Sequence, residues 1–258
     1  MPELCAHRVS KYFAGVRVVN SVQFTLRPGE VVGYLGPNGS GKTTTARMLA
    51  GLLEPSSGRV EYDGRDIRND LVGFRRELGY IPEEPYLYPF LSGREYLQLV
   101  GRLRELPDTL LASKIDGFLN LFGLRIAADQ AISSYSKGMR QKIVISAALM
   151  HDPSVVLFDE PETGLDVSTT MMLRHLVRLL AARGKAILYS SHILEVVERV
   201  CDKVIVLHKG DVVADDSIER LTTLMSSTSL EGVFSQLVIR DDPQKVAADV
   251  ADVSAMSA

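Results

Sequence analysis

The sequence has few cysteines, no long apolar run and little excess charge, and each shortage excludes a class of protein. Its 258 residues include two cysteines, Cys5 and Cys201, which lie far apart and lack the close spacing of metal ligands. We therefore expect two reduced thiols and no disulfide framework. The longest apolar run, 143–150, is far shorter than the roughly 20 residues of a membrane-spanning helix. If the protein works at a membrane, another chain must supply the spans.

The charge balance gives no reason to expect a nucleic-acid partner. The formal net charge is −3, whereas clustered positive charge is the electrostatic footprint of nucleic-acid binding. With 46% hydrophobic and 24% charged residues, the composition is that of an ordinary globular protein. The length suits one large α/β domain with a subdomain inserted.

The most informative stretch is a glycine-rich loop that fits the pattern G-x-x-x-x-G-K-[ST]. An apolar strand pattern, 31–35, precedes it, and a helical pattern, 44–53, follows. Strand, glycine turn and helix start together present backbone N–H groups to an anion at the positive end of a helix. We expect this loop to bind nucleotide phosphates through Gly36, Pro37, Asn38, Gly39, Ser40, Gly41, Lys42, Thr43 and Thr44.

Two side chains of the loop have distinct chemical roles in this interpretation. Lys42 would place its charge on the β- and γ-phosphates, and the Thr43 hydroxyl would ligate a magnesium ion. The alternative is a glycine-rich turn that happens to precede Lys-Thr. The loop alone indicates a nucleoside triphosphate and leaves open what its hydrolysis drives.

The rest of the chain predicts an α/β fold built around this loop. Residues 3–32 and 59–64 have β patterns, so a β-rich N-terminal part flanks the loop on both sides. From Ser92 to about 124 the pattern is helical, and Ser92 with Glu95 forms a capping box. We expect a helical subdomain at about 88–145, inserted between strands.

Alternating strands and helices resume after this block. Continuous apolar runs at 155–158 and 186–189 are typical of buried parallel strands, and 204–214 reads as a hairpin turning at Lys209-Gly210. We therefore expect a mostly parallel core sheet, an N-terminal antiparallel β subdomain and one α/β domain over 1–240. The segment 241–258 is rich in Ala, Asp and Ser, and we expect a solvated, disordered tail.

Polar side chains follow two of the predicted strands where each strand ends. Asp159 and Glu160 close the run at 155–158, and His192 follows the run at 186–189. Ligands of open α/β sheets bind at this edge. Asp159 would hold magnesium, Glu160 would act as general base on the attacking water, and His192 would donate to the γ-phosphate. The alternative for Asp159 and Glu160 is that they are acidic residues that merely start a loop, and the alternative for His192 is a structural role.

The segment 135–142 stands before another helical pattern. Ser136 is a natural N-cap, and that could be its whole role. It could also mark a second anion site at a helix N-terminus, without a loop of its own to fill it.

Taken in order, these motifs resemble the ATP-binding subunit of an ABC transporter, a P-loop ATPase, over nearly the whole chain. The order is the phosphate loop, a Q-loop region near Glu83, a signature at 135–139, a Walker B strand at 155–160, a D-loop at 164–166 and the switch residue His192. Tyr-Ser-Lys-Gly-Met at 135–139 is similar to the ABC-2 type bacterial exporter branch.

The resemblance implies an ATPase that uses ATP and Mg2+ and forms a nucleotide-sandwich dimer. ATP on one subunit would be closed by Ser136 and Gly138 of the other, with Asp166 and Glu83 beside the nucleotide and Glu83 also near the metal. It implies a second ATPase subunit and separate polytopic membrane permease subunits, with this chain cytoplasmic on the inner face of the cell membrane. We expect Glu83 and the helical block from Ser92 to about Leu124 to meet the permease.

Several residues depart from the family pattern. The usual signature is L-S-G-G-Q, but Tyr135, Lys137 and Met139 replace three of its five residues. Glu83 stands where most members carry Gln, and Glu162 where Thr is usual. Because Ser136 and Gly138 remain, we expect the γ-phosphate contacts to survive.

The family stacks adenine on an aromatic residue upstream of the first core strand. Phe13 is our first choice and Tyr12 the alternative. Both could instead be ordinary core aromatics.

Two other functions compete with a transporter subunit. Soluble ABC ATPases that act on ribosomes or DNA are tandem pairs of cassettes, or carry long coiled coils or zinc insertions. This sequence shows one cassette, no heptad run and no Cys pairs. A P-loop kinase or GTPase would lack the signature, D-loop and switch histidine. The sequence does not reveal the cargo.

Overall fold

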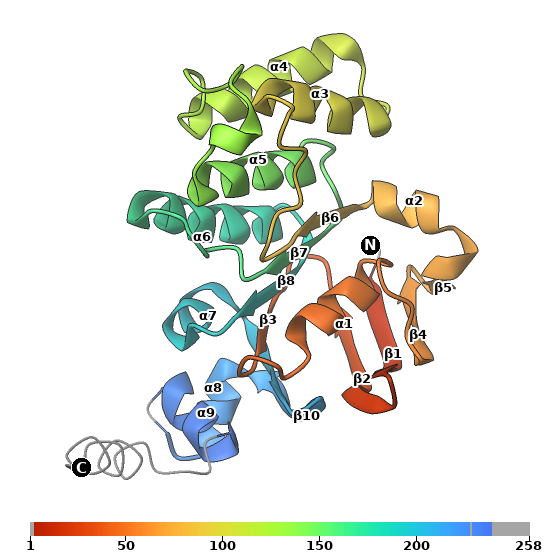
Figure 1. Ribbon diagram of the computed structural model, residues 1–258. Helices are drawn as coiled ribbons and strands as arrows, with labels where there is room; N and C mark the ends of the chain where they lie inside the picture. Colours follow the sequence, from red (N-terminus) through yellow and green to blue (C-terminus); the bar gives the residue numbers. More distant parts are fainter. Residues whose placement is uncertain (1–2, 228, 239–258) are drawn as a thin grey trace, which may run out of the picture.

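The computed structural model describes residues 3–227 and 229–238, and the tail expected at 241–258 lies outside them. Within this part of the chain the strands form two sheets (Figure 1). The smaller sheet is antiparallel, in the order β2-β1-β4-β5. Its strands are β1 (Leu4–Phe13), β2 (Val16–Leu26), β4 (Ser57–Tyr62) and β5 (Arg65–Asp66).

The larger sheet has the order β10-β9-β3-β8-β7-β6. Its neighbours are parallel except β10 and β9, which form the expected hairpin. The prediction of a mostly parallel core sheet beside an antiparallel one is confirmed. The strands are β3 (Val31–Leu35), β6 (Leu78–Ile81), β7 (Val155–Asp159), β8 (Ala186–Ser191), β9 (Lys203–His208) and β10 (Asp211–Ser217).

Helices cover both faces of the larger sheet, and α3 and α4 stand at the end farthest from the antiparallel sheet (Figure 1). Helices α8 and α9, which follow β10, were not expected from the sequence. The helices are α1 (Lys42–Leu49), α2 (Leu71–Arg76), α3 (Gly93–Leu103), α4 (Asp108–Leu121), α5 (Lys137–Leu149), α6 (Val167–Ala182), α7 (Leu194–Val200), α8 (Ile218–Leu224) and α9 (Leu230–Val238).

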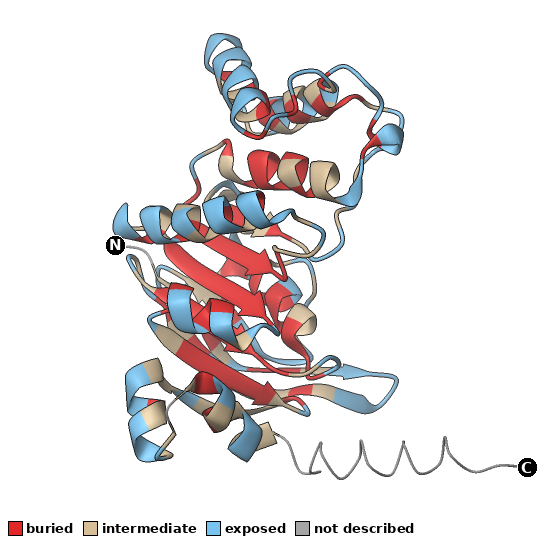
Figure 2. Ribbon diagram, turned by 90° about the vertical axis from the view of Figure 1, so that its left-hand side faces the viewer, coloured by how far each residue is buried: buried red, intermediate tan, exposed pale blue. Residues whose placement is uncertain are grey.

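The central strands are buried on both faces (Figure 2), which explains their continuous apolar sequences. Successive side chains of a strand point to opposite faces. In β3, Val31 and Leu35 join the core shared with α3 to α7, whereas Val32 and Tyr34 join the core shared with α1 and the antiparallel sheet. Strand β3 therefore sits between two cores, and the loop that leaves its end starts from a rigid point.

The helix boundaries follow from local chemistry. Ser92 and Glu95 form the predicted capping box at the start of α3. The helix expected at 44–53 begins earlier, at Lys42, and ends at Leu49. It ends there because Gly51 takes a left-handed conformation with φ of 64°, which commonly terminates a helix.

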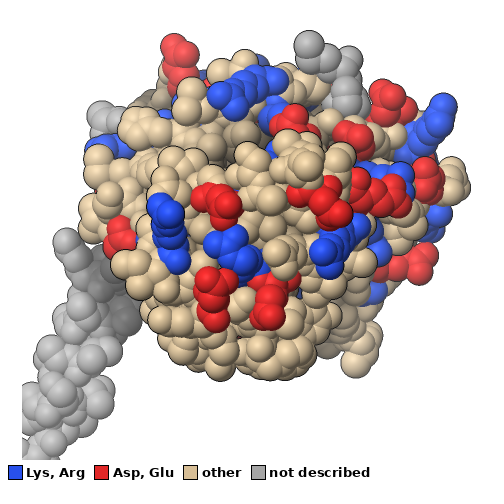
Figure 3. All heavy atoms as spheres, turned by 90° about the horizontal axis from the view of Figure 1, so that it is seen from above, with Lys and Arg blue, Asp and Glu red and all other residues tan. Residues whose placement is uncertain are grey.

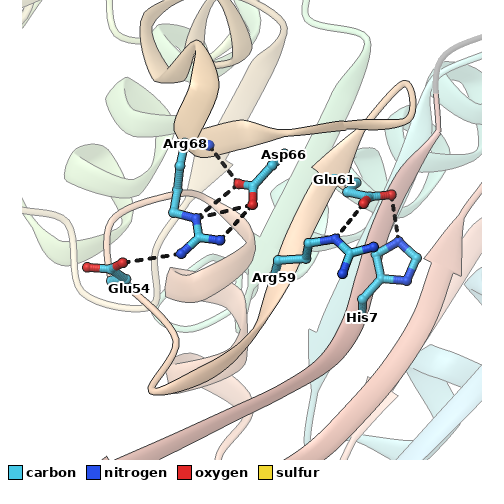
Figure 4. Close-up of polar contacts among 6 residues, drawn as sticks. All are labelled: His7, Glu54, Arg59, Glu61, Asp66 and Arg68. Atoms are coloured by element: carbon cyan, nitrogen blue, oxygen red, sulfur yellow. Dashed lines mark hydrogen bonds and ion pairs between the residues drawn. The ribbon is translucent and has the colours of Figure 1, made fainter.

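Ion pairs link side chains on the surface of the antiparallel sheet and of the segment after it (Figure 4). Glu61 on β4 accepts from Arg59 and contacts a ring nitrogen of His7 on β1 at 2.8 Å. Arg68 reaches Asp66 at 2.7 Å, and it contacts Glu54 from the loop after α1. Exposed pairs of this kind contribute at most about 1 kcal/mol each, so burial of the two cores dominates the stability.

Candidate functional site

The glycine-rich loop leaves β3 and enters α1 through a turn that only glycine fits well. Gly41 has a φ of 106°, and a Cβ added there would lie 2.8 Å from the carbonyl oxygen of Val18. Gly39 also takes a positive φ, 78°. Left-handed backbone of this kind favours glycine, so the spacing of the motif reflects the shape of the loop.

Neighbouring backbone fixes the base of the loop. The N–H of Ser40 donates to the Pro37 carbonyl at 3.1 Å, and the Ser40 carbonyl accepts from the Gly210 N–H at 3.0 Å. Gly210 lies in the β9–β10 turn, far away in the sequence. The loop is therefore held in shape without a ligand, as a preformed phosphate site requires.

Lys42 is buried at the mouth of the loop with its ammonium group on polar partners. Its Nζ donates to the Gly36 carbonyl at 2.7 Å and lies 3.6 Å from Oε1 of Glu160. Only 7% of the residue is exposed. A buried ammonium that one phosphate could draw away from a loop carbonyl is suited to anion binding.

A cleft of about 270 Å³ opens beside the loop. Three predicted groups meet there, since the phosphate loop, Glu83 and Glu160 share its walls. Val18 on β2 also lines the cleft, and no sequence signal pointed to it. Gly36, Pro37 and Ser40 form the base of the loop instead. The lining residues are Val18, Asn38, Gly39, Gly41, Lys42, Thr43, Thr44, Glu83 and Glu160.

Asp159 ends β7 and is fully buried. Its Oδ1 has no hydrogen-bond partner in the described part of the chain, and its Oδ2 accepts from the Tyr80 hydroxyl at 3.4 Å. Burial raises the pKa of Asp159; the Thr43 and Ser190 hydroxyls oppose this effect, and the charges of Glu160 and Glu83 reinforce it.

These residues fit a divalent cation. A buried carboxylate oxygen without a partner, a threonine hydroxyl and two further carboxylates give hard oxygen donors and excess negative charge. The described residues contain no cluster of three or more His, Cys, Asp or Glu side chains able to form a metal cage by themselves. Magnesium needs no such cage, because one or two carboxylates plus substrate phosphates and water usually hold it.

Glu160, which lines the cleft, forms a close pair with His192. The carboxylate Oε2 of Glu160 lies 2.7 Å from Nδ1 of His192, and its Oε1 faces Lys42. Glu160 has a φ of 48°, an uncommon value outside glycine. Its backbone N–H donates to the Ser190 carbonyl at 3.1 Å. The ends of β7 and β8 thus bring together the two side chains that the strand pattern predicted to converge.

The signature and D-loop residues do not line this cleft. Ser136 accepts from the Met139 N–H at 3.2 Å and caps α5, as its sequence position predicted. A Cβ added to Gly138 would lie 2.7 Å from the Gly164 carbonyl oxygen, so the two loops pack backbone to backbone. They form one tight unit within a single chain.

Asp166 has a structural role that the sequence analysis missed. It caps α6, accepting from the N–H and the hydroxyl of Thr169 at 2.8 Å each, and its Oδ2 lies 3.4 Å from Nζ of Lys142. The Thr169 N–H and hydroxyl lower the pKa of Asp166 to about 2, with help from Lys142. The D-loop is therefore tied to the helix that the signature begins.

Tyr12 and Phe13 lie at the surface, 44% and 47% exposed, at the end of β1. The alternative that they are core aromatics is wrong. Nζ of Lys11 lies 5.4 Å from the Phe13 ring centroid. Either ring is accessible for stacking, and neither lines the cleft.

A buried parallel strand, a glycine loop with an ammonium group and two carboxylates at the end of β7, two strands away in the sheet, define a P-loop nucleotide-hydrolysing protein. Comparisons with known proteins agree. Residues 19–163 match the family model described as ABC transporter. The chain is 39% identical to the ABC transporter ATP-binding protein NatA of Bacillus subtilis, over 92% of this chain and 96% of that protein.

Two further relatives extend this result. A Nod factor export ATP-binding protein I of Ralstonia nicotianae is 35% identical over 86% of this chain and 69% of its own length. The solved structure of an ATP-binding subunit of an ABC transporter superimposes with a TM-score of 0.85 at 31% identity, over 91% of this chain and 98% of the other.

The chain belongs to the ABC transporter family, as an ATP-binding subunit with ATPase activity. None of the helices among the described residues has both the length and the apolar composition needed to cross a bilayer.

Proposed function

We propose that this chain hydrolyses ATP with Mg2+ as one of two ATPase subunits and thereby powers export through separate membrane permease subunits. It would work at the cytoplasmic face of the cell membrane. One observation supports the proposed dimer. The cleft beside the phosphate loop is open, whereas the signature that would close it stands apart on the same chain. A second subunit supplies the missing wall.

The signature loop has the chemistry for this contact. The Ser136 oxygen accepts from the Met139 N–H, which leaves its own hydrogen free to donate to a phosphate. The first N–H groups of α5 have no acceptor within the helix, and they add positive potential at the same place. Gly138 and Gly164 hold the loop in shape through their close packing.

Hydrolysis follows from the residues around the cleft. Lys42 would neutralise the β- and γ-phosphates, and Glu160 would take a proton from the attacking water. His192 holds the Glu160 carboxylate and would contact the γ-phosphate from the same place. Magnesium, held by Thr43 and Asp159 with Glu83 nearby, would offset negative charge on the transferred phosphoryl group. Asp166 and the adenine-stacking ring, Phe13 or Tyr12, complete the proposed nucleotide contacts.

A second surface fits the membrane partner. A groove of about 670 Å³ runs between α1, α2, β6, α3 and α5. Arg47, Arg75 and Arg104 line it and form no ion pair within the described residues, although the nearby Arg76 and Arg102 each face a carboxylate. Tyr86, Tyr96, Val100 and two alanines of α5 supply its apolar wall. The groove suits a short apolar segment of the permease that carries an acidic side chain.

The helical end of the molecule is otherwise charge-balanced. Seen from the α3–α4 end, basic and acidic side chains are intermingled (Figure 3). Arg94 on α3 is already engaged, with Asp116 at 2.7 Å and Asp129 at 3.0 Å. Unlike Arg94, the arginines of the groove have no ion pair within the described residues and are therefore available to a partner. The relative named for Nod factor export supports export as the direction.

The dimer can be tested through the cap of α5. In a Glu160→Gln background, which keeps ATP bound, we expect a dimer with ATP and a monomer with ADP on size exclusion. Adding Ser136→Asp keeps a good N-cap but sets a negative charge against the phosphate, so the dimer should be lost. Adding Ser136→Asn keeps a neutral cap, and the dimer should persist. A dimer that survives the aspartate would contradict the proposed signature contact.

A further inference from the structure

Glu162 connects three elements that carry functional motifs. It lies two residues after Glu160 and two before Gly164, on the loop between β7 and α6, and its side chain is 10% exposed. Its Oε1 accepts from the Tyr189 hydroxyl of β8 at 2.7 Å and from Nε of Arg174 on α6 at 3.0 Å. Its Oε2 accepts from Nη2 of Arg174 at 3.1 Å. One carboxylate thus ties the loop to β8 and to α6.

Arg174 and Glu162 form a bidentate ion pair, which is the strong form of a charged hydrogen bond. Two N–H donors of the arginine each contact one oxygen of the carboxylate. Tyr189 is fully buried and packs on Phe158 with ring centroids 5.9 Å apart. Burial and the adjacent Glu162 charge raise the pKa of Tyr189, so its hydroxyl remains a donor. Without Glu162 this hydroxyl would be a buried donor with no partner, which is costly.

The loop that Glu162 anchors is under strain at Glu160. A non-glycine residue with a φ of 48° persists only where the surroundings hold it. The Glu160 N–H is fixed on the Ser190 carbonyl, and the Leu165 N–H on the Glu162 carbonyl at 3.0 Å. Tyr189 precedes Ser190 on the same strand, so the Glu162–Tyr189 bond clamps the loop next to the strained residue.

We propose that Glu162, with Tyr189 and Arg174, is a positioning cluster that holds the Glu160 carboxylate between Lys42 and His192. None of the three residues lines the cleft beside the phosphate loop, so the cluster acts through Glu160. Because Arg174 lies on the helix that Asp166 caps, the cluster also links the D-loop to the catalytic base. The inference rests on the proposed role of Glu160.

The first test is Tyr189→Phe, which keeps the buried ring and removes one hydroxyl. The second is Glu162→Gln, which keeps an acceptor for Tyr189 but loses the charge that Arg174 grips. In both, kcat for ATP hydrolysis should fall about ten- to a hundredfold, because small misplacements of catalytic groups cost that much. KM for ATP should stay within about twofold, since the phosphate loop is untouched. Arg178→Gln, one turn farther along α6 in an exposed pair with Asp202, is the matched control and should keep wild-type kcat.

A merely structural cluster gives a different result. It would lower the midpoint of thermal unfolding and leave kcat unchanged well below that temperature, and this outcome would overturn the proposal. A single-turnover measurement in the Glu160→Gln background adds a second criterion. Glu162→Gln should cost nothing further there, because its effect passes through Glu160. An additional loss would contradict the positioning role.

The two proposals fail separately. If Glu160→Gln turns over ATP like the wild type, Glu160 is not the base and the proposed mechanism is wrong. If Glu160→Gln is inactive while Tyr189→Phe and Glu162→Gln retain full kcat, the base stands and only the positioning cluster is refuted.

Discussion

Replacing Glu160 by glutamine removes the proton acceptor of the site and changes little of its shape. The amide has the shape of the carboxylate and can still pair with His192, which lies 2.7 Å from Oε2. It cannot take a proton. Loss of a general base costs about 10²- to 10⁴-fold in rate, or roughly 3 to 5 kcal/mol of barrier. ATP should bind at least as tightly, because the substitution removes one negative charge from the cleft and leaves the positive charge of Lys42 in place.

The assay compares two quantities on the same protein. Phosphate release gives kcat, and titration with ATP gives affinity. Glu195→Gln, an exposed glutamate paired with Arg199, makes the same chemical change elsewhere and should leave both values unchanged. A Glu160→Gln protein that hydrolyses ATP at the wild-type rate would remove Glu160 from the mechanism.

Three further outcomes follow from the structure. Arg104→Glu should uncouple ATP hydrolysis from transport in the assembled complex, because it reverses charge in the groove, whereas Arg102→Glu, outside the groove, should not; equal transport in both variants would reject the docking surface. Gly41→Ala should abolish ATP binding while the chain stays folded, because the new Cβ meets the Val18 carbonyl at 2.8 Å in a left-handed turn; calorimetry with ATP checks this. Burial, reinforced by the nearby Arg104 charge, lowers the pKa of His151 from 6.5 to about 4. The unfolded chain therefore binds this proton more readily, and stability should decline as pH falls from about 6.5 toward 4. In His151→Gln, the free energy of unfolding measured with urea should depend less on pH over that range. A pH dependence equal to that of the wild type would contradict the assignment.

Local patterns were enough to predict the strand, glycine turn and helix of the loop at 36–44 and the ends of the core strands. The loop geometry is dictated by glycines within a few residues, so its motif carries its own structure. Asp159, Glu160 and His192 were predicted to converge because parallel strands end at one edge of a sheet, and the Glu160–His192 contact shows that convergence.

Contacts between distant segments could not be predicted in this way. The Glu162–Arg174–Tyr189 cluster joins residues up to 27 positions apart, and no periodicity encodes that pairing. Val18 reaches the cleft only because β2 packs beside the loop. Tyr12 and Phe13 remained ambiguous because their exposure depends on where β1 leaves the sheet. The cap by Asp166 had a local signal, an aspartate before a helical run, and could have been found.

The most direct test of the central claim is release of phosphate from ATP by the purified chain, with and without Mg2+, beside Lys42→Ala. Wild-type protein should hydrolyse ATP only when Mg2+ is present. Lys42→Ala should be nearly inactive and equally well folded by circular dichroism, because the Lys42 ammonium contacts the loop carbonyl of Gly36 and faces the phosphate cleft. A well-folded Lys42→Ala protein with undiminished turnover would contradict the assignment of this cleft as the site of hydrolysis.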